Sequence, residues 1–326
     1  MKIDWTQITP KQLFALQLEK LGRINPILNK LRKSFSRSDE CAFFTTRDNM
    51  PIFYRTWRSK ELSDVEKIVL CIHGLHSHGE KFVLLADEIS SHPWDVYAID
   101  LRGHGLSWDN IKDVGDIRDF TLWIKDVKEI LHFLSKQYPD IPVCMVAESM
   151  GAALAIHVAV EKPKNLRSLI LLSPAFKAWQ AVEFSLIMET MAFGLLGPRT
   201  KPTIPVQSKS HSGTNNPIYH QYELNDPLRL ALASPRYHYQ VLKMIFQLRS
   251  YFFEEFKPNS FYPTNIFYGG ADHLVDFQGD LEFIRRIHTR NKDLHYIPDA
   301  AHELLTDRNA IDYGIYDKIT TWIARF

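Results

Sequence analysis

The pattern of apolar and polar positions along the chain alternates between two kinds of segment. Short, continuously apolar runs are typical of parallel strands that are covered on both faces. We predict such strands at residues 67–73, 95–100, 143–147, 166–173, 265–269 and 294–297. Longer segments with apolar residues three and four positions apart predict helices at residues 82–89, 120–134, 150–161, 237–253 and 312–324. This alternation indicates an α/β fold with a mostly parallel, doubly wound sheet.

Two parts of the chain depart from this alternation. Residues 41–46 and 52–57 are β-rich runs on either side of Asp48-Asn49, which predicts a hairpin. About ninety residues separate the strand ending at Ser173 from the strand starting at Asn265, far more than a crossover needs. We therefore predict that residues 178–234 form a cap, or lid, over the carboxyl ends of the strands, where open α/β sheets bind ligands. Residues 41–177 and 235–326 then form the core.

Within the predicted cap, three segments differ in character. Residues 202–217 are polar and rich in proline, which predicts a mobile loop, and residues 226–232 are expected to be helical. An apolar, methionine-rich segment contains Phe184, Met188, Met191 and Phe193. Methionine side chains adapt to flexible apolar ligands, so this segment is expected either to line an acyl pocket or to fasten the cap to the core.

Residues 1–40 form a basic extension with its own amphipathic pattern. Residues 1–38 carry eight Lys and Arg against Asp4 and Glu19, a net charge of +6. Apolar residues at helical spacing predict one or two helices here. Two interpretations stay open: the helices pack on the domain, or residues 10–37 contact an anionic membrane surface as a peripheral anchor.

Composition narrows the class of protein. A hydrophobic content of 45% is ample for a large core, and a formal net charge of +1 argues against a general nucleic-acid partner. The sequence contains no apolar run of 18 residues and no apolar signal core at its start, so we expect no transmembrane helix and no secretion. Of three cysteines, Cys71 and Cys144 lie in predicted strands and are expected to be buried. These features predict a cytoplasmic protein.

The candidate chemistry begins at the strand 143–147. Glu148, Ser149, Met150 and Gly151 follow it directly, and an alanine-rich helix comes next. A small residue two positions before a serine and another two positions after it allow a tight strand-to-helix turn, called a nucleophile elbow, which exposes the serine hydroxyl. We predict that Ser149 is the nucleophile and that the backbone N–H of Met150 donates to an oxyanion. The alternative is an ordinary strand-to-helix connection that contains a serine.

A serine nucleophile needs a base that is oriented by a carboxylate. In this architecture the chain order is nucleophile, acid, histidine. Asp272 follows the predicted strand 265–269 and a glycine turn, which makes it the candidate acid, with Asp276 as the competitor. His302 follows the last predicted strand and is the candidate base. The alternative for His302 is a surface loop histidine.

The loop after the strand 67–73 supplies the remaining candidates. An oxyanion requires two fixed N–H donors, and this loop is where the second is expected. Leu75, which follows His73-Gly74, is the predicted second donor. His73, His76 and His78 also suggest a metal site, but the sequence shows no partner cluster of histidines or carboxylates, so we predict no metal.

Together these segments resemble the α/β-hydrolase superfamily, and within it the monoacylglycerol lipase and lysophospholipase group of serine hydrolases. The residues that carry the resemblance are His73-Gly74-Leu75, Asp100 to Ser107, Ala147 to Gly151, Gly270 to Val275 and His302. Ala147 departs from the usual glycine, and the cap region carries none of the motifs on which the resemblance rests. The resemblance covers residues 41–326 and implies an α/β-hydrolase fold that cleaves carboxylic esters, often with an acyl chain under the cap, and uses no cofactor.

Rival functions stay open beside this resemblance. A thioesterase or an aminopeptidase-like hydrolase can use the same fold and triad. A binding module that has lost catalysis is disfavoured because all three triad positions are filled. The substrate is thus expected to be a small-molecule ester or lipid, while its leaving group, the preferred acyl length and the oligomeric state do not follow from the sequence.

Overall fold

The computed structural model describes residues 40–59, 64–110, 113–177, 204–205, 213–226, 228–254 and 261–326. The predicted N-terminal helices, and the cap residues Phe184, Met188, Met191 and Phe193, lie outside these residues. The division into core and cap therefore stays a prediction. Within the described part of the chain, none of the helices combines the length and the apolar character that crossing a bilayer requires.

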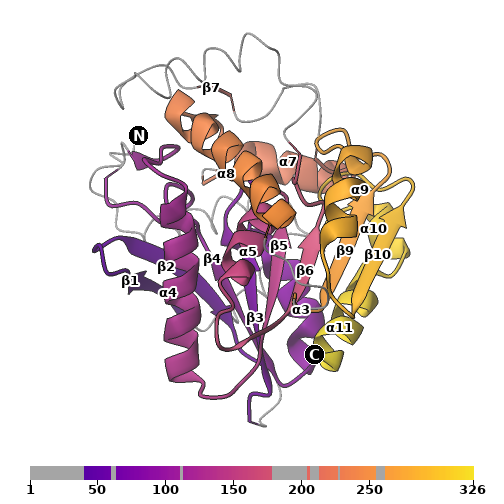
Figure 1. Cartoon of the computed structure of the whole chain (residues 1–326), viewed down its shortest axis with the longest axis horizontal. Coiled ribbons are helices and arrows are strands. Elements are labelled where there is room, and N and C mark those ends of the chain that lie inside the picture. Colours follow the sequence, from indigo (N-terminus) through magenta and orange to yellow (C-terminus); the bar gives the residue numbers. More distant parts are fainter. Residues whose placement is uncertain are drawn as a thin grey trace.

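The described residues form a sheet of eight strands (Figure 1), in the order β1-β2-β4-β3-β5-β6-β9-β10. The strands are β1 (Glu40–Thr45), β2 (Pro51–Trp57), β3 (Lys67–Ile72), β4 (Trp94–Ile99), β5 (Val143–Glu148), β6 (Leu166–Leu172), β9 (Thr264–Gly269) and β10 (Lys292–Ile297). Strand β2 is antiparallel to β1 and β4, and the other pairs are parallel. The predicted hairpin, the predicted strands and the mostly parallel sheet are confirmed.

Helices cover both faces of this sheet (Figure 1). One face carries α4 (Thr121–Gln137), α5 (Met150–Val160), α8 (Pro235–Glu254) and α9 (Phe277–Arg286), and the other carries α3 (Val83–Glu88), α10 (Arg308–Asp312) and α11 (Ile315–Arg325). The sequence of β3 is continuously apolar because both faces of the strand are covered. Ile68, Leu70 and Ile72 pack into the first layer, while Val69 and Cys71 pack into the second.

The order of the central strands locates the crevice where a ligand can bind. After β3 the chain moves outward to β4 and then returns to the opposite side of β3 as β5. The segments that follow β3 and β5 therefore leave the sheet in opposite directions, and open α/β sheets bind ligands at such a switch point. The candidate residues Leu75 and Ser149 lie in these two segments.

One prediction about the region between β6 and β9 is wrong. The described residues among 226–232 are not helical; the helix is α7 (Pro217–Asn225), and a short strand β8 (Leu232–Ala233) pairs with β7 (Ile204–Pro205). The Asn216 side chain caps α7 by accepting from Ile218 N and Tyr219 N. Asp226 has an extended backbone with ψ of 116°, because a residue that precedes a proline, here Pro227, is disfavoured from the helical region.

Helix α9 was not predicted at all. Its local signal is Asp276, whose side chain accepts a hydrogen bond from Gly279 N and so caps the first turn. The competitor for the catalytic acid thus has a structural role in this fold.

Candidate active site

Ser149 lies at the apex of the turn between β5 and α5. Its backbone has φ of 55° and ψ of −119°, a conformation that side-chain-bearing residues rarely adopt. Its N–H donates to the carbonyl of Leu172 at 2.9 Å, which ties the turn to β6. The serine is partly exposed, whereas its neighbours Glu148 and Met150 are buried. The tight strand-to-helix turn predicted at Ser149 is therefore present, while the role of Ser149 as nucleophile stays a prediction.

Close packing explains the small residues around this turn. A Cβ on Gly151 would lie 2.4 Å from the carbonyl oxygen of His73, so α5 could not approach the end of β3 with a larger residue there. Ala147 is fully buried in the sheet, where its single methyl group fits. A Cβ on Gly74 would lie 3.1 Å from Ser149 Cβ, which shows that the segment after β3 passes directly beside the serine.

His302 and Asp272 are brought together from two different loops. Asp272 follows β9 and His302 follows β10, and His302 Nδ1 lies 2.7 Å from Asp272 Oδ2. The other carboxylate oxygen of Asp272 accepts from the N–H groups of Leu274 and Val275, at 2.7 and 3.2 Å. With Nδ1 engaged by the carboxylate, Nε2 is the ring nitrogen available for proton transfer.

Burial and the Asp272 charge act in opposite directions on His302. Burial alone would lower the pKa of the imidazole, but the charge of Asp272 and its hydrogen bond outweigh burial, and the pKa is raised above its ordinary value. Asp272 therefore favours the protonated ring, which is the form that a general base must adopt during the reaction.

The end of β6 joins the serine and the histidine. Leu172 O accepts from Ser149 N, and Ala175 N donates to Ser149 O at 3.2 Å. Between them, the Ser173 hydroxyl donates to the carbonyl of His302 at 2.7 Å. The segments that carry Ser149, His302 and Asp272 therefore lie together at the carboxyl ends of β5, β10 and β9. Asp276 instead forms an ion pair with Lys177 at 2.8 Å, besides capping α9.

The predicted oxyanion donors are the N–H groups of Met150 and Leu75. Met150 begins α5 directly after Ser149. The peptide that carries the Leu75 N–H is held by His73, whose Nδ1 lies 2.7 Å from Gly74 O while its Nε2 accepts from Leu101 N at 2.9 Å. Because a trans peptide directs its C=O and N–H oppositely, anchoring Gly74 O fixes the direction of the Leu75 N–H. Burial lowers the pKa of His73 well below its usual range, so the ring is neutral.

The next carbonyl of this loop is held as well. Leu75 O accepts from the Tyr237 hydroxyl at 3.0 Å and lies 3.1 Å from His104 Nε2. Tyr237 comes from α8 and His104 from the segment after β4. The carbonyl of Leu75 is therefore held by distant elements, whereas the carbonyl of Gly74 is held by the neighbouring His73. The supporting roles of His73, His104 and Tyr237 were not predicted from the sequence. His73 and His104 do lie in two segments that carry the family resemblance, His73-Gly74-Leu75 and Asp100 to Ser107, and this position was the only sequence signal for their role.

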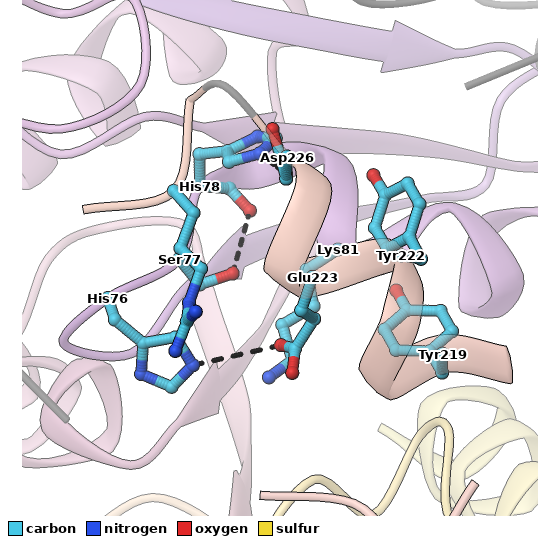
Figure 2. Close-up of a pocket in the computed structure, with 9 residues that line it drawn as sticks. His76, Ser77, His78, Lys81, Tyr219, Tyr222, Glu223 and Asp226 are labelled. Atoms are coloured by element: carbon cyan, nitrogen blue, oxygen red, sulfur yellow. Dashed lines mark hydrogen bonds and ion pairs between the residues drawn. The ribbon is translucent and has the colours of Figure 1, made fainter. Parts of the chain in front are cut away.

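Beside this loop lies a small pocket of about 20 Å³, shown in Figure 2. Tyr219 and Tyr222 of α7 line one side, and His76 to His78 line the other. His78 Nε2 lies 2.6 Å from Asp226 Oδ2, and Leu230 N donates to His76 O at 2.9 Å. The region of the predicted cap around α7 is therefore fastened to the segment that carries Leu75.

The floor of this region is a buried cluster of charges. His76 Nε2 lies 3.2 Å from Glu303 Oε1 and 3.7 Å from Glu223 Oε1. The Lys81 ammonium lies 2.5 Å from Glu148 Oε1 and 3.4 Å from Glu303 Oε1. The expectation that the His73, His76 and His78 cluster has no carboxylate partners is wrong, because residues distant in sequence supply them.

This cluster has a donor set that a divalent ion could use. His76, Glu223 and Glu303 place three ligand atoms within 4.8 Å of one another. Lys81 and protonated His76, however, already supply positive charge to these carboxylates. Burial would lower the pKa of His76, but its interactions with the Glu223 and Glu303 carboxylates outweigh burial and raise the pKa to about 9. Lys81 and protonated His76 thus place two positive charges among three carboxylates, those of Glu148, Glu223 and Glu303.

The His76 cluster predicts a pH dependence of stability. The pKa of His76 rises from 6.5 to about 9 on folding, so its contribution is complete below pH 6.5 and is lost as the pH rises through 9. Urea denaturation measures the unfolding free energies of the wild type and of His76→Gln. We expect them to differ most at about pH 6 and to converge by about pH 10. A difference that stays constant over this range would contradict the assignment.

Comparisons with known proteins agree with this geometry. The model of the family described as Serine aminopeptidase, S33 matches residues 63–309. The monoglyceride lipase of Homo sapiens is 25% identical over 292 residues, which cover 85% of this chain and 88% of the lipase. The uncharacterized protein YnbC of Escherichia coli (strain K12) is 25% identical over 293 residues, and the chain spans only 46% of its length.

Among solved structures, a soluble variant of the monoglyceride lipase of Saccharomyces cerevisiae, in complex with a substrate analog, has a TM-score of 0.76. Its sequence identity is 19%, and the alignment covers 88% of this chain and 95% of that one. At this identity the likeness concerns the fold, which is that of the α/β-hydrolases.

Proposed function

Because the chain belongs to the serine aminopeptidase S33 family of α/β-hydrolases, whose model matches residues 63–309, we propose that it is a serine hydrolase that cleaves carboxylic esters. The observation that carries this proposal is the 2.7 Å pair between His302 Nδ1 and Asp272 Oδ2, at the sheet edge where Ser149 adopts its strained turn. A serine, a histidine and an aspartate in this arrangement have the roles of nucleophile, base and orienting acid.

In the proposed reaction, Ser149 Oγ attacks the carbonyl carbon of the ester while His302 Nε2 accepts the hydroxyl proton. The carbonyl oxygen becomes an oxyanion that accepts from the N–H groups of Met150 and Leu75. When the C–O bond to the alcohol breaks, His302 returns the proton to the departing alkoxide, which leaves an acyl-enzyme on Ser149. Water then attacks the acyl carbon, His302 takes one proton from the water, and Ser149 regains its proton as the carboxylic acid leaves.

The raised pKa of His302 suits this cycle. The imidazolium that forms after proton transfer is stabilised by the adjacent Asp272 carboxylate, the same interaction that raises the pKa of the ring. Nucleophile, base, acid and both oxyanion donors all come from the protein, so the proposed reaction requires no cofactor.

The proposed substrate class is an acylglycerol or a lysophospholipid. Curated relatives from several organisms carry the names monoglyceride lipase and monoacylglycerol lipase, and the sequence resemblance points to the same group. The second candidate is an aminopeptidase, which the printed description of the matching family names. A thioesterase is the third, because the same triad also cleaves thioesters.

A substrate panel separates these candidates. We expect kcat/KM for p-nitrophenyl esters to rise from acetate towards medium chains, because each buried CH₂ of the acyl chain contributes up to about 0.8 kcal/mol. We also expect 1-monoacylglycerol to be cleaved faster than a matched acyl thioester or an aminoacyl p-nitroanilide. Release of glycerol, free thiol and p-nitroaniline measures the three reactions, with Ser149→Ala as the blank.

The panel also shows which proposal fails. Fast cleavage of the aminoacyl anilide and slow cleavage of every ester would move the assignment to an aminopeptidase. An ester profile that peaks at acetate would exclude an acyl pocket and favour a small-ester hydrolase instead.

A further inference from the structure

Lys81 is a buried cation that the proposed reaction does not use directly. It lies in the 3-10 helix η1 (Gly79–Phe82), and its side chain is only 3% exposed. Its two acidic partners, Glu148 and Glu303, have side chains that are 2% and 0% exposed. Burial alone would lower the pKa of the ammonium, but the charges of Glu148 and Glu303 outweigh it and raise the pKa. Lys81 is therefore charged inside the protein.

The two acidic partners of Lys81 are neighbours in sequence of the proposed nucleophile and the proposed base. Glu148 directly precedes Ser149, and Glu303 directly follows His302. One ammonium group thus contacts the residue next to the proposed nucleophile, at 2.5 Å, and the residue next to the proposed base, at 3.4 Å. Each of the two carboxylates is thus attached to the backbone directly beside a proposed reacting residue.

A buried ion pair is a poor way to gain stability, because an apolar replacement of similar size is often neutral or stabilising. What ion pairs do supply is a fixed geometry between elements that are otherwise independent. The turn after β5 and the loop after β10 come from different parts of the sheet, and proton transfer between Ser149 and His302 depends on their separation at the level of about 1 Å. An ammonium that binds both elements sets that separation.

We propose that Lys81 is a positioning residue, which holds Ser149 and His302 in register by binding Glu148 and Glu303 together. This inference rests on the proposed function. Lys81 touches neither the ester nor the reacting atoms, so its loss should act on kcat and leave KM nearly unchanged.

The test measures the rate at which a fluorophosphonate modifies Ser149, together with kcat and KM for a p-nitrophenyl ester. Lys81→Met removes the charge and keeps most of the volume, and it is expected to slow both phosphonylation and kcat at least about tenfold. Lys67→Met is the matched control. Lys67 lies at the opposite end of β3, where its ammonium donates to Ile323 O at 2.6 Å, and its loss should leave both rates within about twofold of the wild type.

A second variant separates positioning from charge balance, since Lys81→Met leaves two carboxylates buried without their ammonium. The triple variant Lys81→Met/Glu148→Gln/Glu303→Gln is neutral at these three positions, so its thermal stability should recover. Its phosphonylation rate should stay at least about tenfold below the wild type, because the amides cannot replace the ammonium clamp.

A triple variant that is phosphonylated within about twofold of the wild-type rate would overturn the inference and leave Lys81 with charge balance alone. This outcome differs from failure of the proposed function, in which the wild type itself is not phosphonylated at Ser149.

Chemical rescue of Lys81→Ala by small amines gives a further check. Lys81 lines the pocket in Figure 2, so methylammonium or ethylammonium added to Lys81→Ala should raise kcat, while the neutral alcohols of the same size should not.

Discussion

Ser149→Ala is expected to lower kcat for ester hydrolysis by about four to six orders of magnitude while the fold survives. The alanine lacks the oxygen that would form the acyl-enzyme, so only unassisted attack by water is left. The fold should persist because the contacts of Ser149 with Leu172 and Ala175 are made by its backbone. Steady-state kinetics measures kcat, and thermal unfolding followed by circular dichroism measures the stability of the fold.

The matched control is Ser90→Ala. Ser90 is a buried serine that follows α3, on the face of the sheet opposite α5. Its hydroxyl donates to the carbonyl of Asp87 at 2.6 Å. We expect this variant to keep the wild-type kcat. If both serine variants retained wild-type activity, another residue would be the nucleophile.

Asp272→Asn is the second large effect, with an expected loss in kcat of about 10⁴-fold. The asparagine carbonyl can still accept from Leu274 N and Val275 N, which leaves the amide NH₂ facing His302 Nδ1. An NH₂ donor at that position selects the tautomer that carries its proton on Nε2, and this nitrogen can then no longer accept the proton of Ser149. Stability should change little because the loop keeps its hydrogen bonds.

Asp276→Asn provides the comparison four residues away. Asparagine is as good a helix cap as aspartate, so α9 should form normally, while the ion pair with Lys177 is lost. We expect kcat close to that of the wild type. Inactive Asp276→Asn together with active Asp272→Asn would show that the acid has been misassigned.

The core of the fold could be predicted because its signals are local. Runs such as Ile68 to Ile72 are apolar at every position, and this pattern arises when both faces of a strand are covered, as the two layers around β3 show. The turn at Ser149 could be predicted for a similar reason. Its small neighbours, Ala147 and Gly151, follow from contacts with residues of the sheet and the end of β3.

The parts that could not be predicted depend on contacts between distant residues. The helical prediction at 226–232 failed because Pro227 forces Asp226 out of the helix, and the capping asparagine at 216 starts α7 earlier. The buried charge cluster joins residues 76, 81, 148, 223 and 303, which share no local pattern. The only local signal for this cluster was that Glu148 and Glu303 each lie in a segment that the fold buries.

The central claim is that Ser149 is the nucleophile of a serine hydrolase, and covalent labelling tests it most directly. A fluorophosphonate forms a phosphorus–oxygen bond to an activated serine and expels fluoride, and mass spectrometry of proteolytic peptides locates the adduct. We predict one equivalent of label on the peptide that contains Ser149, no label on that peptide in Ser149→Ala, and much slower labelling in Asp272→Asn. Equal labelling of the wild type and Ser149→Ala, or an adduct on a different serine, would contradict the account.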